Sequence, residues 1–361
     1  MITVNRKLRI LNLMETLGMG GGQTMMFELS NGLNKYYGDH CCSLVAGTKN
    51  SAGKVVVYHK LLQSYGIDYK LLSWDEIAKF CKRESIDVVL HHRVSISSPL
   101  RAYIPKHIPY IVISHTAASI EKIKDFYKVA DYLVSVCQNL LKYSPKIKYL
   151  SPERMPVILN GIENDFIKDI EPLKLRGVFK TGRCHRLVPT KFALDSLGWF
   201  ENNRHQLLGH VHYLMGTGNK ALPHAAQNKQ SIVYVGEISD RQIKYSYLKA
   251  FDAYFYEINC NEGASMAVLE SLGCGVPVIC RPKGGIKELV THKVNGFIER
   301  DRPAMLRRLQ KLMKNDKLPK LKEAILKDFD ERLHVRHCAK RYLNLCRQAV
   351  SEKTGDKKWK S

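Results

Sequence analysis

Two glutamates, Glu262 and Glu270, are the residues of this chain whose type and spacing most clearly suggest chemistry. Seven residues separate them, so on a helix they would lie about two turns apart and share one face. Gly263 follows the first glutamate, and Gly273 and Gly275 follow the second. A helix N-terminus of this kind binds phosphate, and carboxylates beside it accept hydrogen bonds from sugar hydroxyls. The pair alone fits a solvated helix with two ordinary surface acids equally well.

The elements that must position these residues follow an alternating pattern of strands and helices. Apolar runs of strand length occur at residues 8–14, 42–46, 68–72, 87–90, 110–114, 132–136, 156–159, 186–188, 211–215, 231–235, 253–258 and 277–279. Helical spacing of apolar residues fills most of the intervals, as at residues 23–35. Strands that alternate with helices predict α/β domains with parallel sheets covered on both faces.

The pattern divides into two successive α/β halves, and 361 residues suffice for two domains with separate cores. We predict an N-terminal Rossmann-like domain over residues 1–167 and a charged, proline-containing linker over residues 168–180. A second Rossmann-like domain is expected over residues 181–345. A basic helix and tail follow over residues 346–361, and this tail can return to the first domain. Ligands are expected at the carboxyl ends of the strands, in the cleft between the domains.

The composition is that of a globular protein, with 45% hydrophobic and 25% charged residues. No apolar run approaches the length of a membrane span, and the first residues lack the sustained apolar core of a signal peptide. The ten cysteines form no CxxC pair and no metal-like spacing with histidine. We therefore expect reduced thiols, no structural metal and a cytoplasmic location.

The chain is strongly basic, with 57 lysines and arginines against 34 aspartates and glutamates, a net charge of +23. Residues 1–170 hold 22 basic and 15 acidic residues, and residues 171–361 hold 35 and 19. A single charged run is usually a solvated helix face, but an excess of this size attracts polyanions or anionic lipid. We therefore expect a polyanionic partner, and nothing in the sequence indicates an obligate protein partner.

Five segments resemble, in order and spacing, the retaining GT-B glycosyltransferases of family 4, which use nucleotide-sugars. The resemblance covers most of residues 8–300. Its landmarks are Gly18-Met19-Gly20-Gly21-Gly22-Gln23, Asn160-Gly161-Ile162, Arg186-Leu187-Val188-Pro189-Thr190-Lys191, Gly216-Thr217-Gly218, and the Glu262/Glu270 pair followed by Gly284-Gly285-Ile286 and Glu288. Each motif is weak alone, and the set is specific. Phe192 stands where the family usually has glycine, and Ala264-Ser265 replaces a bulkier pair, which leaves the shape of the sugar pocket open.

The resemblance implies a GT-B fold, with two Rossmann-like domains that face each other across a cleft. The first domain would take the acceptor and the second the nucleotide-sugar donor. Glu262 would contact the donor sugar, and Glu270 would bind the ribose hydroxyls. Backbone N–H groups of Gly263, Ala264 and Ser265 would meet the distal phosphate.

Arg186 and Lys191 would clamp the donor diphosphate, because a planar guanidinium and a compact ammonium suit its oxygens. Arg183 is a weaker alternative to Arg186, and Gly216 would line the same site. In the first domain, the loop of Gly20, Gly21, Gly22 and Gln23 would let the backbone approach a phosphate or the acceptor closely. A simple tight turn explains that loop as well.

His115 follows the predicted strand 110–114, where the family often places a histidine that faces the sugar. With Glu262, Arg186 and Lys191 it completes the expected catalytic set, although a structural role explains a lone histidine equally well. His91 and His92 end the preceding strand and are further candidates on the acceptor side. Retention of configuration implies that the leaving phosphate takes the acceptor proton, so no protein nucleophile is expected.

No cofactor or metal is expected beside the nucleotide-sugar. The triplet Asp328-Phe329-Asp330 superficially resembles a metal-binding motif, but it lies in the basic helical end of the chain, far from the other landmarks. Fixed cations can stabilise the leaving diphosphate in place of a metal.

The acceptor is the least determined part of the prediction. The spread of basic charge over both halves slightly favours DNA with a hydroxymethylated base, as in viral DNA glycosylation, which requires base flipping. The alternative is a lipid-linked or lipopolysaccharide acceptor at the cytoplasmic membrane face, with the basic-apolar segment 53–65 touching lipid. A core-facing helix explains that segment equally well. A remote third reading is an inactive scaffold that binds nucleic acid.

Overall fold

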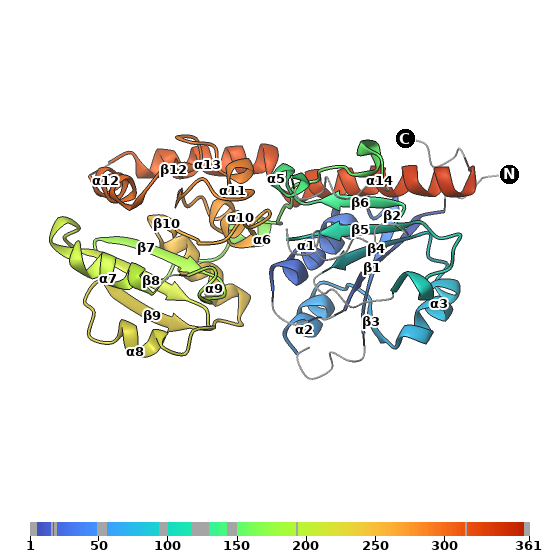
Figure 1. Ribbon diagram of the computed structural model, residues 1–361, viewed down its shortest axis with the longest axis horizontal. Helices are drawn as coiled ribbons and strands as arrows, with labels where there is room; N and C mark the ends of the chain where they lie inside the picture. Colours follow the sequence, from blue (N-terminus) through green and yellow to red (C-terminus); the bar gives the residue numbers. More distant parts are fainter. Residues whose placement is uncertain are drawn as a thin grey trace. The chain divides into compact units, whose positions relative to one another are not determined.

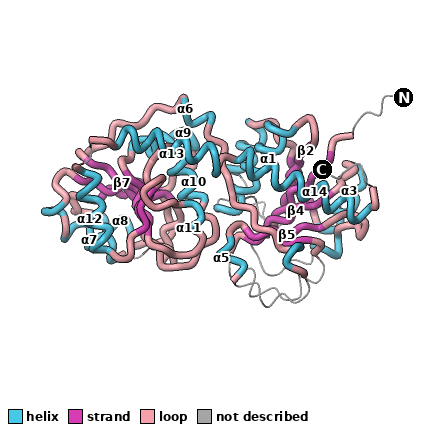
Figure 2. Tube along the Cα trace, turned by 90° about the horizontal axis from the view of Figure 1, so that it is seen from above, coloured by secondary structure: helices cyan, strands magenta, loops and turns pink. Residues whose placement is uncertain are grey.

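The computed structural model describes residues 6–15, 17, 20–48, 56–93, 100–116, 130–142, 150–192, 194–314 and 316–356. The chain forms two compact units. Unit 1 contains residues 1–163 and 335–361, and unit 2 contains residues 164–334. Each unit has a six-stranded sheet, labelled in Figure 1, and within each unit helices lie on both sides of the strands (Figure 2).

The sheet of unit 1 has the strand order β3-β2-β1-β4-β5-β6, and all neighbouring strands are parallel. Its strands are β1 (Leu8–Met14), β2 (Cys41–Thr48), β3 (Tyr69–Leu72), β4 (Val88–Arg93), β5 (Tyr110–Ser114) and β6 (Tyr132–Ser135). Helices cover both faces of such a sheet, so its central strands are continuous apolar runs. All five residues of β5 are buried for this reason.

The helices of unit 1 are α1 (Gly21–Tyr37), α2 (Val56–Ser64), α3 (Trp74–Arg83), the short α5 (Gln138–Leu141) and α14 (Val335–Thr354). Short 3₁₀ turns occupy Leu100–Tyr103 and Pro152–Arg154. Helix α14 comes from the end of the chain and packs on α1, where Gly32 leaves room for Val335 and Ala339. Figure 1 shows this red helix beside the sheet built from the first part of the chain.

The sheet of unit 2 has the order β12-β11-β10-β7-β8-β9, again all parallel. Its strands are β7 (Phe179–Cys184), β8 (His210–Met215), β9 (Ile232–Gly236), β10 (Ala253–Tyr256), β11 (Val278–Cys280) and β12 (Gly296–Ile298). Counted within each unit, both sheets have the order 3-2-1-4-5-6 of a doubly wound Rossmann fold. The predicted pair of Rossmann-like domains is therefore confirmed.

The helices of unit 2 are α6 (Asp165–Lys168), α7 (Asp195–Asn202), α8 (Leu222–Ala226), α9 (Arg241–Ala250), α10 (Met266–Gly273), α11 (Ile286–Leu289), α12 (Arg302–Met313) and α13 (Leu318–Arg332). A 3₁₀ turn spans Arg204–Gln206. An aromatic-rich core containing Phe179, Phe192, Phe200 and Phe255 holds α7, α8 and α12 to the sheet.

The unit boundaries differ from the predicted domain boundaries. Unit 2 ends at residue 334 rather than at 345, because the whole of α14 returns to unit 1. Tyr132 Oη donates to the carboxylate of Glu352 at 2.9 Å, and Lys353 forms an ion pair with Asp131 at 2.6 Å. The predicted linker 168–180 overlaps α6 and β7, so it is not a free connection.

Reassigning α14 also changes the distribution of charge. Unit 1 holds 29 basic and 15 acidic residues, and unit 2 holds 28 and 19. The positive excess is therefore larger in unit 1, at +14 against +9, which reverses the sequence-based distribution. The basic charge is still spread over both units, which is the observation that favoured DNA, but the excess is not greater in the second one.

Three predicted elements are wrong. Residues 186–188 form a loop, and the strand of that region is β7, whose sequence FKTGRC lacks an apolar run. Residues 156–159 contribute one bridge, from Val157 to Ser135, rather than a strand. The two glutamates do not share a helix, because α10 begins at Met266 and Glu262 lies in the preceding loop.

Among the described residues, no helix is both long and apolar enough to cross a membrane. The candidate lipid-contacting segment 53–65 is described only from Val56, where α2 begins. Leu62 of this helix is fully buried in a core cluster with Met14, Phe27 and Val45. This contact supports the core-facing alternative for α2.

Candidate active site

The strand order of unit 2 reverses between β7 and β10, its first and fourth strands. In doubly wound sheets, ligands bind outside the carboxyl ends of the strands at this reversal. The loop after β7 (residues 185–192) carries Arg186 and Lys191, and the loop after β10 (residues 257–265) carries Glu262. Arg186, Lys191 and Glu262 therefore come from the two loops that the topology brings together.

Lys191 and Glu262 are in direct contact. The Lys191 ammonium donates to Glu262 Oε1, and the Tyr256 hydroxyl donates to Glu262 Oε2. Tyr256 Oη also lies 2.9 Å from Ser265 Oγ. Burial lowers the pKa of Lys191, and the positive charges of Arg186 and Arg183 lower it further. Both oxygens of the proposed catalytic carboxylate are thus held by unit 2 itself.

The structure separates the roles of the two candidate arginines. Arg183 is 1% exposed, and its guanidinium donates to the carbonyls of Glu257 (2.8 Å) and Lys191 (3.3 Å) and to the ring of His185. Phe192 stacks over this guanidinium, with 4.8 Å between the Arg183 Cζ and the ring centroid. Arg183 therefore supports the loop from inside, whereas Arg186 is exposed and available to a ligand.

His185 links these groups through a tautomer that its neighbours determine. Its Nε2 faces two guanidinium N–H groups of Arg183, at 2.8 and 2.6 Å, so this nitrogen must be the acceptor. Its Nδ1 then carries the proton and donates to the carbonyl of Arg186 at 2.7 Å. Burial and the neighbouring Arg183 charge hold the pKa of His185 well below its usual value, in agreement with a neutral ring.

Two glycines allow the loops to pack closely. Gly216 has φ of 121°, and a Cβ there would lie 2.1 Å from the carbonyl oxygen of His185. Gly284 has φ of 58°, and a Cβ there would lie 2.2 Å from the carbonyl oxygen of Glu262. That oxygen accepts a hydrogen bond from the Gly285 N–H at 2.8 Å. Gly216 thus shapes the β7 loop, and the Gly284 turn holds the backbone of Glu262.

Glu270 lies on α10 and is 6% exposed. Its carboxylate forms an ion pair of 2.8 Å with Lys244 of α9. Gly263, Ala264 and Ser265, which lead into α10, are buried, and the Ser265 side chain makes no capping hydrogen bond. Each of the two predicted glutamates therefore forms an ion pair with its own lysine. Glu262 and Lys191 both lie on loops, and Glu270 and Lys244 both lie on helices.

The glycine loop of unit 1 lies at the corresponding strand reversal, at the end of β1, although Gly18 and Met19 lie outside the described residues. Gly20 precedes α1, and Gly21, Gly22 and Gln23 form its first turn, which contains no acidic side chain. The Gly20 carbonyl accepts from the Thr24 N–H at 3.0 Å. The N-terminus of α1 therefore lies at the carboxyl end of β1, and the role of the loop at a phosphate or the acceptor stays a prediction.

Two of the candidate histidines of unit 1, His91 and His92, are buried rather than exposed to an acceptor. His91 and His92 are 0% exposed, and His92 Nε2 lies 2.8 Å from Asn12 Oδ1. His115 is partly exposed and stacks on His92, with 5.5 Å between ring centroids. Burial lowers the pKa of His115 from 6.5 to about 4, so its ring is neutral at pH 7. His115 Nε2 has no hydrogen-bond partner among the described residues.

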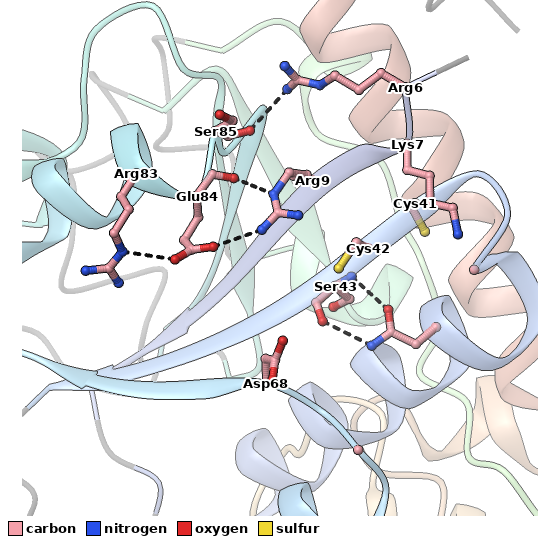
Figure 3. A pocket seen from close by; sticks show the side chains of 13 residues that line it. Arg6, Lys7, Arg9, Cys41, Cys42, Ser43, Asp68, Arg83, Glu84 and Ser85 are labelled. Atoms are coloured by element: carbon pink, nitrogen blue, oxygen red, sulfur yellow. Dashed lines mark hydrogen bonds and ion pairs between the residues drawn. The ribbon is translucent and has the colours of Figure 1, made fainter. Parts of the chain in front are cut away.

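Two other features lie apart from this edge. The carboxylate of Asp328 accepts hydrogen bonds from Arg332 at 2.7 Å and from Asn295 at 2.7 Å, so this aspartate of the triplet has a structural role. A cavity of about 820 Å³ lies at the amino ends of β1 and β2, opposite the glycine loop (Figure 3). Its Arg9 and Arg83 both pair with Glu84, so these two guanidiniums are already engaged within unit 1.

The sequence-based prediction missed Tyr256 and Lys244. Tyr256 is the last residue of β10, a position where an apolar residue is expected. Its contact with Glu262 becomes visible once the structure shows how the following loop folds back. Lys244 lies on the surface-patterned helix α9, 26 residues before Glu270. No sequence motif marks the pairing of Tyr256 with Glu262 or of Lys244 with Glu270.

Comparisons with known proteins agree with this geometry. Residues 216–326 match the family model "Glycosyl transferases group 1". The chain is 22% identical over 241 residues to the uncharacterized glycosyltransferase MJ1069 of Methanocaldococcus jannaschii, covering 63% of this chain and 61% of that protein. It therefore spans less than two thirds of the curated relative it matches.

Solved glycosyltransferases share the fold. Anabaena Alr3699/HepE, in complex with UDP-glucose, superposes with a TM-score of 0.71 at 15% identity, covering 96% of this chain and 100% of that one. The lipopolysaccharide outer core galactosyltransferase WaaB, in its apo form, gives a TM-score of 0.64 at 14% identity, covering 96% and 100%. The two doubly wound units thus have the GT-B fold, and residues 216–326 are a glycosyl transferases group 1 domain.

Proposed function

We propose that this protein is a retaining glycosyltransferase that moves a sugar from a nucleoside-diphosphate sugar to a hydroxyl of a polyanionic acceptor, without a metal ion. One observation carries the proposal. Lys191 and Glu262 meet at the carboxyl ends of β7 and β10, in a unit that contains a glycosyl transferases group 1 domain.

The donor suits the charges around this contact. We assign the two phosphates to the exposed Arg186 and the ammonium of Lys191, and the distal phosphate also to N–H groups of the backbone before α10. Glu270, on α10, would bind the ribose hydroxyls. The complex of Anabaena Alr3699/HepE with UDP-glucose makes a uridine nucleotide the first donor to test.

The reaction breaks the bond between the sugar C1 and the leaving phosphate oxygen and forms a bond from C1 to the acceptor oxygen. Negative charge grows on the phosphate, where Lys191 and Arg186 stabilise it, and positive charge grows on the sugar ring near the Glu262 carboxylate. The acceptor attacks from the face that the phosphate leaves and gives its proton to that phosphate. His115, neutral at pH 7, serves as a hydrogen-bonding group for the sugar rather than as a cation.

A donor screen tests this assignment. Calorimetry with UDP, GDP, dTDP and their glucose and mannose derivatives should identify one nucleotide that binds the wild-type protein. The product of transfer to an acceptor, analysed by NMR of the anomeric proton, should keep the donor configuration. Inversion, or binding of none of these nucleotides, contradicts the proposal.

The acceptor has two candidates, and the corrected charge distribution changes their order. Both units carry a positive excess, which supports a polyanion, but the excess is larger in unit 1. The fold neighbour WaaB acts on the lipopolysaccharide outer core. We therefore place an anionic glycolipid first and DNA with a hydroxyl-bearing base second.

Binding to the two surfaces distinguishes these acceptors. Vesicles with 30% anionic lipid and plain duplex DNA are compared between 50 and 300 mM salt. Vesicle binding with no DNA binding supports the glycolipid. Steep, salt-dependent DNA binding without vesicle binding supports DNA, because each phosphate contact releases counterions.

A further inference from the structure

The last residue of β10, Tyr256, occupies a position that the donor chemistry alone does not explain. Tyr256 is 1% exposed. The His185 ring meets the Tyr256 ring edge-on, with 5.5 Å between centroids, and the Arg183 guanidinium lies 5.9 Å from it. Burial raises the pKa of Tyr256 to about 12, so the hydroxyl keeps its proton at neutral pH. A buried, protonated phenol therefore points at the carboxylate of Glu262.

The direction of each hydrogen bond follows from the number of protons available. An ionised carboxylate only accepts, so the Tyr256 hydroxyl must donate to Glu262 Oε2. The Tyr256 proton is then used, and Ser265 Oγ, 2.9 Å away, must donate to the Tyr256 oxygen. Lys191 donates to Glu262 Oε1. The chain from Ser265 through Tyr256 fixes one carboxylate oxygen while Lys191 holds the other.

The two contacts on Glu262 differ in what happens when a donor binds. Under the proposed function, the Lys191 ammonium binds the diphosphate of the donor. Its hydrogen bond to Glu262 therefore weakens when the donor binds. Tyr256 and Ser265 have no charge to offer a phosphate, and Tyr256 is fully enclosed. Of the two contacts that the described residues make with the Glu262 carboxylate, the tyrosine contact is the one that can keep it in place when Lys191 turns to the donor.

We propose that Tyr256 is a positioning residue for Glu262: its hydroxyl, oriented by Ser265, holds the carboxylate in the rotamer that faces the donor sugar. The inference rests on the proposed function. A buried donor also favours the charged form of the carboxylate, so its removal should raise the pH below which activity is lost. The charged and titratable groups described around this contact are Lys191, Arg183, Arg186, His185, Tyr254, Cys260 and Cys280.

Strand β10 supplies a matched control. Tyr254, two residues earlier, is also fully buried, and burial likewise raises its pKa. Its hydroxyl accepts from the Cys184 N–H at 2.8 Å and donates to the Cys184 carbonyl at 3.2 Å. Tyr254→Phe and Tyr256→Phe therefore each delete one buried hydroxyl from the same strand, but only Tyr256→Phe frees Glu262.

The kinetic test compares both variants with the wild-type protein, using hydrolysis or transfer of the sugar nucleotide that binds in the donor screen. A hydrogen bond to a charged group supports a loss of about ten- to hundredfold in kcat for Tyr256→Phe. The donor KM should stay within about threefold, and the acid limb of the kcat profile should move to higher pH. Ser265→Ala should show a smaller loss in the same direction, and Tyr254→Phe should leave the acid limb unchanged.

A second readout does not depend on turnover. With ¹³C-labelled glutamate side chains, the Glu262 carboxylate resonance is assigned by its absence in Glu262→Gln, and its titration midpoint is followed by NMR. The midpoint should rise in Tyr256→Phe and not in Tyr254→Phe. Equal midpoints and equal kcat losses in the two variants overturn the positioning role. A wild-type protein that turns over no sugar nucleotide, while the midpoint shift is present, overturns the proposed function instead.

Discussion

Acidification should destabilise unit 2 through His210 and its neighbour His212, and His210→Gln should reduce that sensitivity. His210 is 4% exposed, and its Nε2 lies 2.7 Å from Thr181 Oγ1. His212 Nδ1 lies 2.8 Å from the same hydroxyl, and Phe200 stacks on both rings. With neutral rings, the hydroxyl donates to one histidine and accepts from the other. Charging both rings leaves the hydroxyl proton without an acceptor.

The magnitude follows from the pKa of His210, which burial lowers from 6.5 to about 4. Between these values the unfolded chain binds a proton that the folded chain does not, so stability falls as the pH drops below 6.5 and levels off below about 4. One such group costs about 2 kcal/mol between pH 7 and pH 5. His212, whose pKa is lowered in the same direction by burial and by the charge on His210, adds to the loss.

Trp199 in α7 stacks on Phe255 in the same core and reports the unfolding of unit 2. In a background where the other two tryptophans are phenylalanine, urea unfolding is followed by fluorescence at pH 7, 6 and 5. Between pH 7 and pH 5, the unfolding free energy of the protein with His210 should fall by about 2 kcal/mol more than that of the His210→Gln variant. Equal losses in the two proteins, or a difference already complete above pH 7, would refute the reasoning.

Four substitutions test the donor site. Glu262→Gln should reduce transfer at least a hundredfold while circular dichroism and melting temperature stay close to the wild-type values. Lys191→Ala should weaken binding of the selected nucleoside diphosphate at least tenfold in calorimetry, because a cation facing the phosphates is lost. Lys244→Met leaves the buried Glu270 without its ion pair and should cost about 3 kcal/mol in urea unfolding, relieved by adding Glu270→Gln. Gly284→Ala, at φ 58° and against the Glu262 backbone, should lower unfolding free energy by about 2 kcal/mol or more.

Burial on both faces explains which strands the sequence predicts well. Strands β1 and β5 have the predicted bounds, because a strand covered on both sides is a continuous apolar run. The sequence does not predict strand β7, because its buried positions include glycine and arginine. These residues fit the interior of the sheet through contacts with residues far away in the sequence. Gly182 is required there by the ring of Phe251, since a Cβ would lie 2.1 Å from it. Arg183 is buried in this strand because Glu257 and Lys191 supply its acceptors.

The same distinction applies to the site. Lys191 and Arg186 lie on one loop, so their motif is visible in the sequence. The residue at which α10 begins is not determined by neighbouring sequence alone. The Glu262 carbonyl accepts a hydrogen bond from the N–H of Gly285, 23 residues later, and this contact with the Gly284 turn keeps Glu262 out of the helix. The Tyr256 contact depends on that turn, and a helix through residue 262 would have removed it.

The proposed donor site of unit 2 contains its own counter-charges, and this affects how the basic excess of the chain is interpreted. Lys191 pairs with Glu262 and Lys244 with Glu270, so these four groups are electrically balanced before any donor binds. Under the proposed function, a diphosphate that draws Lys191 toward itself would make Glu262 depend on sugar hydroxyls and on Tyr256, and phosphate binding would then be linked to sugar recognition. The net charge of +23 therefore arises outside these pairs, mostly in unit 1. If unit 1 binds the acceptor, as proposed, its excess is best explained by an acceptor that is itself an anion.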